Sequence, residues 1–415
     1  MHTRLADYLA RRFRFDAHYF LKGGFWLTLT QAIVVVAGLL TTAFFAHILS
    51  ETAYGSYRYL LGLAIIFSSF SLTGLGEAIL QATAKQYHRF YKETTVLNFL
   101  YSLPLVLISV CASLYYWFNE NALLSAGCLL IGLLQPIINT FQYTPLFLQG
   151  AKRFRAATFV QGARAVFVAV ITSLALFATQ NILLLLLTYL ASNAFINIVF
   201  YLLYSVPKTD HVPVEIKEKY LTYAKNTSIR NFLSTIAFRL DTVVLFTRFS
   251  AAELAIFSIA TIIPEQIKGS FKSVASLMLP KYAAHPDPEI IKKGIPRRSL
   301  QLFLVLCTIS AAYIIAAPYL YEIFFPKYVS AVLYSQLFAL SFPAYAYYIP
   351  LTLFMAKLDE KKLNDFHFRT SILQILIVIL VVFPFGLLGA IIARLVVQYL
   401  RMIYCFWLTF KAIGL

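Results

Sequence analysis

Two charged residues lie in the middle of an apolar segment of this chain. The segment Ser234–Phe246 consists mainly of apolar and small residues, yet it contains Arg239 and Asp241. Charged side chains are costly inside a lipid bilayer, so in membrane helices they usually face other helices or water. Residues two positions apart project roughly 200° apart on a helix and cannot pair with each other. At least one of the two must therefore meet another helix or a wet cavity.

Two interpretations of this pair are open. In the first, an ion pair with a residue of another helix locks the helices together. In the second, the helix lines a cavity for an anionic substrate, and Arg239 contacts the anion. The next apolar segment favours the second, because four of its polar residues share one face of a helix. They are Thr261, Glu265, Lys268 and Lys272. For Lys272 alone, snorkelling to the membrane surface is an equally good interpretation.

Other ionisable residues also fall inside or at the ends of apolar segments. Arg230 lies near the start of the segment that holds Arg239, Arg164 lies in the middle of another, and Glu77 follows two glycines. A third stripe comprises Arg394, Gln398 and Arg401, which either line a groove or bind lipid headgroups. Basic residues outnumber acidic ones in these positions. A wet cleft with that surplus would attract an anion, and a phosphate or pyrophosphate suits arginine best.

The elements that carry these residues are predicted to be membrane-spanning helices. The chain of 415 residues is 60% hydrophobic and 13% charged, with a mean hydropathy of +0.74, whereas soluble domains carry about 25% charged residues. Long apolar runs recur, each sufficient to cross a bilayer as a helix. We predict an all-α polytopic membrane protein with no soluble catalytic domain. About twelve spans are expected, at 23–47, 57–80, 96–118, 122–149, 156–178, 182–204, 228–248, 254–280, 300–325, 331–356, 370–386 and 388–410.

Charge in the loops predicts the topology. Lys and Arg gather in alternate loops, for example at 85–92, 152–155 and 357–369, which places those loops and both termini in the cytoplasm. We expect a basic cytoplasmic arm at 1–21, a six-helix bundle at 22–204, a cytoplasmic linker at 205–227 and a second bundle at 228–415. Topology and an anionic leaflet account for most of the net charge of +17, so nucleic-acid binding is not expected.

Several kinds of chemistry find no support in the sequence. The four cysteines fall inside predicted spans, and the seven histidines have no paired spacing, so neither disulfides nor a metal site is expected. No nucleophile, base and oxyanion constellation is present, and no catalytic residue or organic cofactor is predicted.

A weak internal repeat relates the two predicted bundles. Residues 48–57, between the first two spans, resemble residues 248–257, between the seventh and eighth. Both connections lie on the same predicted side of the membrane, as a repeat about an axis along the membrane normal requires. The repeat suggests two similar six-helix bundles that flank a central cleft.

Several short motifs follow one another along nearly the whole chain. They are Leu49-Ser50 with Tyr54–Tyr57, Gly74 and Gly76, Gly150–Phe154, Asp241, Phe325–Ala331 and Gly386–Ala390. In their order and spacing they resemble the Wzx-type oligosaccharide flippases of the multidrug/oligosaccharidyl-lipid/polysaccharide exporter superfamily. Ala255 and Phe257 depart from the Gly and Tyr that are frequent in that family.

The resemblance implies a transporter and not an enzyme. Such proteins carry a glycan on undecaprenyl pyrophosphate from the inner to the outer leaflet of a bacterial inner membrane, for O-antigen or other polysaccharide assembly. Its expected partners are the lipid-linked oligosaccharide, membrane lipids and polymerase or chain-length machinery. We expect alternating access around a cationic cavity, with possible coupling to H⁺ or Na⁺. Substrate-binding candidates are Arg239, Lys268, Arg230, Lys272 and Arg164, and ion-coupling candidates are Asp241, Glu265 and Glu77.

Two alternatives belong to other functional classes. A multidrug cation antiporter of the same superfamily would need an acidic, aromatic cavity, whereas this chain carries a basic surplus. A membrane polymerase, ligase or glycosyltransferase acting on lipid-linked glycans would need catalytic residues on sizeable outer loops. The predicted outer loops are about ten residues or shorter, which disfavours such an enzyme.

Overall fold

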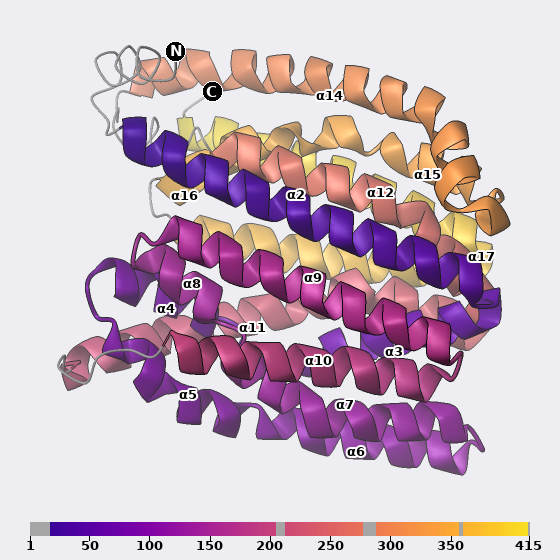
Figure 1. The fold of residues 1–415 in the computed structure, drawn as a ribbon. Coiled ribbons are helices and arrows are strands. Elements are labelled where there is room, and N and C mark those ends of the chain that lie inside the picture. Colours follow the sequence, from indigo (N-terminus) through magenta and orange to yellow (C-terminus); the bar gives the residue numbers. More distant parts are fainter. Residues whose placement is uncertain (1–16, 205–211, 277–287, 357–359, 414–415) are drawn as a thin grey trace. The chain divides into compact units, whose positions relative to one another are not determined.

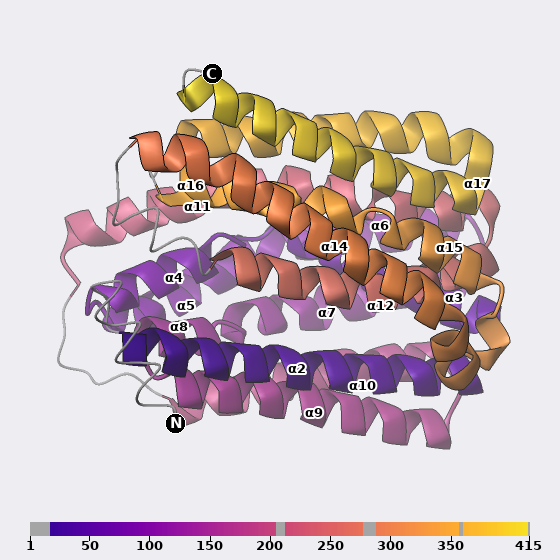
Figure 2. The ribbon, with the colours of Figure 1, turned by 90° about the horizontal axis from the view of Figure 1, so that it is seen from above.

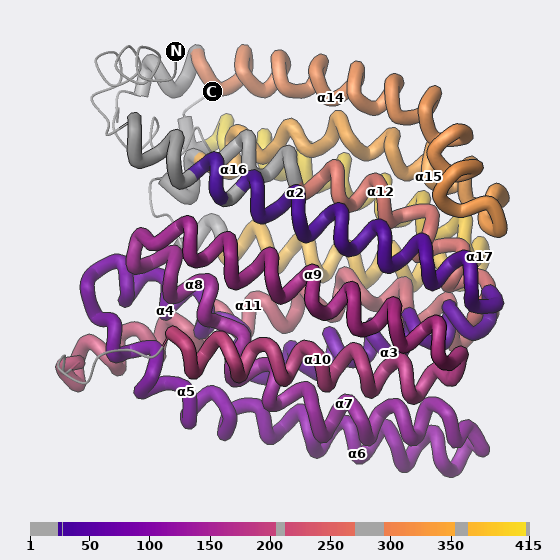
Figure 3. Tube along the Cα trace, in the orientation of Figure 1, coloured from indigo at the N-terminus to yellow at the C-terminus, as the bar shows by residue number. Residues whose placement is uncertain are grey.

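The computed structural model describes residues 17–204, 212–276, 288–356 and 360–413 (Figures 1 and 3). Within these ranges the side chains of 17–23, 27, 270–276, 288–293, 353–356, 360–363 and 412–413 are outside the described set. Most of the predicted basic arm, the start of the predicted linker and the end of the eighth predicted span therefore lie outside the described residues. Every regular element in the described ranges is a helix, which confirms the all-α prediction.

Seven helical stretches of the described residues are long and apolar enough to cross a membrane, in keeping with a multi-pass membrane protein. They are Gly24–Ile48, Arg89–Phe118, Ala122–Gly150, Phe154–Ala178, Ile182–Leu203, Gly294–Phe324 and Asn364–Lys411. Helix α11 (Val214–Val244) and the part of α12 (Ala251–Ser276) with described side chains are not among them. Both helices contain ionisable residues of the predicted stripes, which count against a membrane span.

The chain divides into two compact units, unit 1 with residues 1–45 and 60–235 and unit 2 with residues 46–59 and 236–415. In unit 1, α6 packs on α7, α7 on α10 and α10 on α9, and α4 packs on α8 (Figure 1). The bounds are α2 Ala17–Ile48, α4 Leu75–Ala84, α5 Arg89–Tyr101, α6 Leu103–Phe118, α7 Ala122–Phe141, α8 Thr144–Gly150, α9 Phe154–Ala178 and α10 Ile182–Leu203.

In unit 2, α12 packs on α15, and the 3₁₀ segment η3 packs on α14 and α17. The bounds are η1 Leu245–Phe249, α14 Pro288–Phe324, η2 Pro326–Tyr328, α15 Ala331–Ala339, η3 Phe342–Tyr347, α16 Tyr348–Ala356 and α17 Glu360–Ile413. Helix α17 folds back on itself at Gly386, which has a φ of +54° (Figure 2). Glycine adopts that conformation at little cost, and the predicted turn between the last two spans is confirmed there.

Several predicted spans are divided between two or more helical elements. The span expected at 57–80 is interrupted between α3 (Glu51–Ser68) and α4, where the Ser69 and Ser71 hydroxyls donate to the carbonyls of Ile66 and Ser68. Such local bonds compete with helical ones. The Gly74 N–H instead donates to Ser228 Oγ at 2.9 Å, so the irregular backbone is satisfied inside the protein. The span expected at 331–356 is likewise divided into α15, η3 and α16.

Candidate substrate and coupling site

A buried ion pair joins α11 to α17 inside unit 2. Arg394 Nε donates to Asp241 Oδ2 at 2.5 Å, and the two side chains are 6% and 0% exposed. The other carboxylate oxygen of Asp241 accepts the backbone N–H of Thr242 at 2.7 Å. Both oxygens of Asp241 are thus occupied. The first of the two interpretations, an ion pair between helices, describes Asp241.

The remaining groups of Arg394 are also engaged. Its Nη1 lies 3.2 Å from Glu265 Oε1, and its Nη2 donates to the carbonyl of Phe238 at 3.3 Å. The guanidinium carbon lies 4.4 Å from the ring centroid of Phe238 and 4.8 Å from that of Phe257. Two aromatic faces and two carboxylates therefore hold the guanidinium, as suits a delocalised planar cation.

Glu265 connects Arg394 to a second cation, Lys268. Its Oε2 lies 3.1 Å from Lys268 Nζ, and the two side chains are 25% and 19% exposed. The ammonium also lies over the rings of Phe238 and Tyr345, at 5.2 and 5.5 Å. The predicted stripe on α12 thus brings Glu265 and Lys268 together, and α17 supplies Arg394.

Arg239 does not share the carboxylate of Asp241. Its guanidinium carbon lies 5.4 Å from the ring of Phe238, and its Nε is buried without a hydrogen-bond partner. Among the residues with described side chains, no carboxylate forms an ion pair with Arg239. Arg239 is therefore a half-buried cation beside a cluster whose carboxylates already have partners.

Unit 1 holds a separate group on α11 and α4. Arg230 Nη2 lies 3.6 Å from Glu77 Oε2, which also accepts the Tyr223 hydroxyl at 3.1 Å. Burial raises the pKa of the Tyr223 phenol, and the neighbouring Glu77 carboxylate raises that pKa further. Tyr223 thus keeps its proton at neutral pH and can donate it to Glu77.

Replacing Glu77 with glutamine should change the free energy of unfolding by less than about 1 kcal/mol, because exposed ion pairs contribute little. The Glu77 side chain is 50% exposed, and glutamine still accepts a hydrogen bond from Tyr223. Thermal unfolding in detergent at low and high salt checks this expectation. A large loss of stability would instead indicate that Glu77 is a structural anchor. A loss of transport without a loss of stability would support its predicted role in ion coupling.

The other predicted residues lie apart from these groups or cannot be placed. Arg164 of α9 donates from Nη1 to Asn197 Oδ1 of α10 at 3.4 Å, within unit 1. Lys272 belongs to α12, but its side chain is outside the described set. Unit 2 thus gathers Arg239, Asp241, Glu265 and Lys268.

The central member of this site, Arg394, was missed by the sequence analysis. Its stripe on the last span was visible, but it was interpreted as a groove or a headgroup site. Arg394 instead lies inside unit 2 against Asp241 and Glu265. One signal was available, because a carboxylate inside a membrane helix requires a cation. The two residues are 153 positions apart, and periodicity along one helix says nothing about a partner on another.

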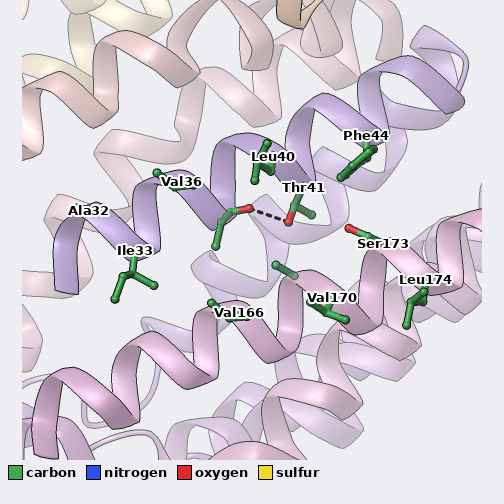
Figure 4. Close-up of a pocket in the computed structure, with 12 residues that line it drawn as sticks. Ala32, Ile33, Val36, Leu40, Thr41, Phe44, Val166, Val170, Ser173 and Leu174 are labelled. Carbon is green, nitrogen blue, oxygen red and sulfur yellow. Dashed lines mark hydrogen bonds between the residues drawn. The ribbon is translucent and has the colours of Figure 1, made fainter. Parts of the chain in front are cut away.

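An apolar groove lies between α2 and α9 of unit 1, with a volume of about 530 Å³ (Figure 4). Val36, Leu40 and Phe44 of α2 face Val166, Val170 and Leu174 of α9 across it. The only hydroxyls in its lining belong to Thr41, which donates to the Ala37 carbonyl at 2.8 Å, and Ser173. Such a lining suits a hydrocarbon chain, and it contains no charged side chain that could bind a phosphate.

The family of the chain follows from its sequence. Residues 20–280 match the profile of a family described as "Polysaccharide biosynthesis protein". The chain belongs to this family. The resemblance stated from the motifs is confirmed at the level of the family. No curated protein matches this family member significantly by sequence.

Solved structures show which fold this family member has. A "Lipid II flippase MurJ, inward closed conformation" matches with a TM-score of 0.69 and 14% identity, over 92% of this chain and 86% of that one. An outward-facing "multidrug resistance MATE family transporter of the MOP superfamily" matches with a TM-score of 0.61 and 14% identity, over 95% of both chains. An inward-facing conformation of a "multidrug resistance MATE family transporter of the MOP superfamily" matches with a TM-score of 0.64 and 15% identity, over 94% of both chains. At these identities the likeness shows the fold alone, which is that of MOP-superfamily transporters.

Proposed function

We propose that this protein translocates an undecaprenyl-pyrophosphate-linked oligosaccharide from the inner to the outer leaflet of a bacterial inner membrane. The glycan would then enter O-antigen or another surface polysaccharide, together with polymerase and chain-length machinery. The observation that carries this proposal is the charge of the unit 2 site. The described part of this site holds three cations, Arg239, Lys268 and Arg394, and two carboxylates, Asp241 and Glu265. Arg239 has no ion-pair partner among the described side chains. An anionic headgroup suits such a site.

The three cations take different parts in this proposal. All three guanidinium nitrogens of Arg394 have partners, and these contacts join α11, α12 and α17. We therefore assign Arg394 and Asp241 to the framework of the site. Arg239 and Lys268 are half-buried and bind the pyrophosphate. Arg230, Lys272 and Arg164 are further contacts along the path.

Glu265 is the carboxylate best suited to coupling. It lies between Arg394 and Lys268, at 3.2 and 3.1 Å. An arriving pyrophosphate competes with Glu265 for Lys268. Once displaced from Lys268, the partly buried carboxylate binds a proton or Na⁺ more readily. The substrate and the ion thereby shift the same equilibrium between the inward-facing and outward-facing conformations, as alternating access requires. Glu77 is a second candidate for this role.

Neutralising Arg239 and Lys268 together should reduce translocation at least about tenfold, because hydrogen bonds to charged groups contribute about 1.5–3 kcal/mol each. The assay follows a fluorescent undecaprenyl-pyrophosphate oligosaccharide between leaflets of proteoliposomes. It compares the native protein with Arg239→Gln/Lys268→Gln. Arg248→Gln is the matched control, because Arg248 is exposed and lies over the Phe383 ring. Native-like translocation by the double variant would refute the assignment.

A cation antiporter is a second candidate, since the multidrug transporters share the fold. The basic surplus of the unit 2 site disfavours it, because a cationic drug would be repelled. The same proteoliposomes test this alternative with a cationic dye and a proton or sodium gradient. Dye export without any movement of lipid-linked glycan would replace the flippase proposal with the antiporter.

A further inference from the structure

Arg164 is a cation in the interior of an apolar, membrane-spanning helix of unit 1. It belongs to α9, ten residues after Phe154, where the helix begins, and fourteen before Ala178, where it ends. At 1.5 Å per residue these separations are about 15 and 21 Å along the helix axis. A charged side chain at such a depth normally pairs with an opposite charge or meets water. A counter-ion for Arg164 is therefore expected.

The described carboxylates do not supply that counter-ion. Glu77 and Glu93 form the ion pairs of unit 1 among the described side chains, and both pair with other cations. Arg164 instead donates from Nη1 to Oδ1 of Asn197, a neutral amide on α10, at 3.4 Å. This distance is long for a hydrogen bond. A single weak bond to an uncharged group leaves the charge of the guanidinium uncompensated.

The amide of Asn197 is also incompletely satisfied. The residue is 3% exposed, and its Nδ2 is buried without a hydrogen-bond partner in the described part of the chain. Arg164 fixes the orientation of this amide, because the reverse orientation would place two donors against each other. A buried N–H without an acceptor is costly and indicates a bound water or ion. The same pair of helices thus holds a cation without a counter-ion and a donor without an acceptor.

We propose that a chloride ion binds between α9 and α10 of this protein, with Arg164 and Nδ2 of Asn197 as its donors. A water molecule would satisfy the amide but would leave the guanidinium uncompensated. One cation beside a nearly inaccessible amide suits a small monovalent anion, whereas a pyrophosphate brings more charge and more atoms. This inference goes beyond the proposed function and does not depend on it. A substrate that contacts Arg164 during transport displaces the ion, so the two assignments are compatible.

Binding of radioactive chloride to the purified full-length protein tests the site directly. The protein is kept in detergent with gluconate as the other anion, and a scintillation proximity assay measures bound chloride. Chloride should bind saturably, and bromide should displace it, whereas the larger gluconate should not. Arg164→Gln should weaken binding at least about tenfold, because the charge that attracts the ion is removed. Arg155→Gln is the matched control, since Arg155 is an exposed residue of the same helix and its loss should leave chloride binding unchanged.

Replacing Asn197 with aspartate supplies the missing negative charge within the chain. Its carboxylate would pair with Arg164, so Asn197→Asp should bind at least about tenfold less chloride than the native protein. Chloride in place of gluconate should raise the melting temperature of the native protein and leave that of Asn197→Asp unchanged. Each comparison is repeated in an Arg239→Gln background. Arg239 also lacks an ion pair among the described side chains, and chloride bound there would otherwise be counted.

Three results would overturn the chloride site. The first is a native protein that binds no chloride, and the second is equal binding by Arg164→Gln and Arg155→Gln. The third is equal stabilisation by chloride and gluconate, which would be a general effect of ionic strength. If Arg164→Gln does not fold, as thermal unfolding would show, Asn197→Asp decides, because undiminished chloride binding there excludes the site. Translocation of the lipid-linked glycan is measured separately, so each of these results leaves the flippase proposal standing.

Discussion

Replacing Arg394 with glutamine should lower the free energy of unfolding by about 3–5 kcal/mol, the usual consequence of leaving a buried charge unpaired. Asp241 is 0% exposed, and Arg394 is its cationic partner at 2.5 Å. Without the guanidinium, the carboxylate retains only the N–H and hydroxyl of Thr242, at 2.7 and 3.3 Å. Glu265 loses a partner as well. Chemical or thermal unfolding of the purified protein in detergent measures the loss.

A second arginine of the same helix provides the control. Arg369 Nε lies 2.7 Å from Asp365 Oδ1, which is a similar geometry, but the two side chains are 65% and 37% exposed. Arg369→Gln should therefore change the free energy of unfolding by less than about 1 kcal/mol. The double variant Asp241→Asn/Arg394→Gln should recover much of the stability lost in Arg394→Gln, since no buried charge is then unpaired. Equal effects of Arg394→Gln and Arg369→Gln would contradict the framework role of Arg394.

The sequence predicted the helices well where apolar runs are uninterrupted. The bounds of α9 and α10, Phe154–Ala178 and Ile182–Leu203, differ by at most two residues from the expected spans. Length and hydropathy suffice there, because a helix in a bilayer must satisfy all its own backbone groups. Gly386 was also visible, since small residues mark a turn between two long apolar runs.

The breaks in α3/α4 and α15/η3/α16 could not be predicted in the same way. The break after Ser68 combines local hydrogen bonds of Ser69 and Ser71 with a tertiary contact that the sequence does not reveal. The Gly74 N–H is satisfied by Ser228, a residue 154 positions away. The same limit applied to the site. The stripe of Glu265 and Lys268 was found because its residues share a helix, whereas Arg394 contacts Glu265 from another helix.

Replacing Gly55 with alanine should destabilise unit 2 by more than the 1–3 kcal/mol that overpacking usually costs. A Cβ atom at Gly55 would lie 1.8 Å from the carbonyl oxygen of Ala251 and 2.5 Å from its carbonyl carbon. Both are backbone atoms at the start of α12, so no side-chain rotation relieves the clash and the helices must separate. The motif Tyr54-Gly55-Ser56-Tyr57 therefore carries its glycine for a packing reason.

Gly38 offers the matched control for thermal unfolding in detergent. It is an exposed glycine of α2 with nothing within 4 Å of an added Cβ. Gly38→Ala should leave the melting temperature unchanged or raise it, because alanine favours a helix over glycine by about 1 kcal/mol. Equal melting temperatures for Gly55→Ala and Gly38→Ala would refute the close contact.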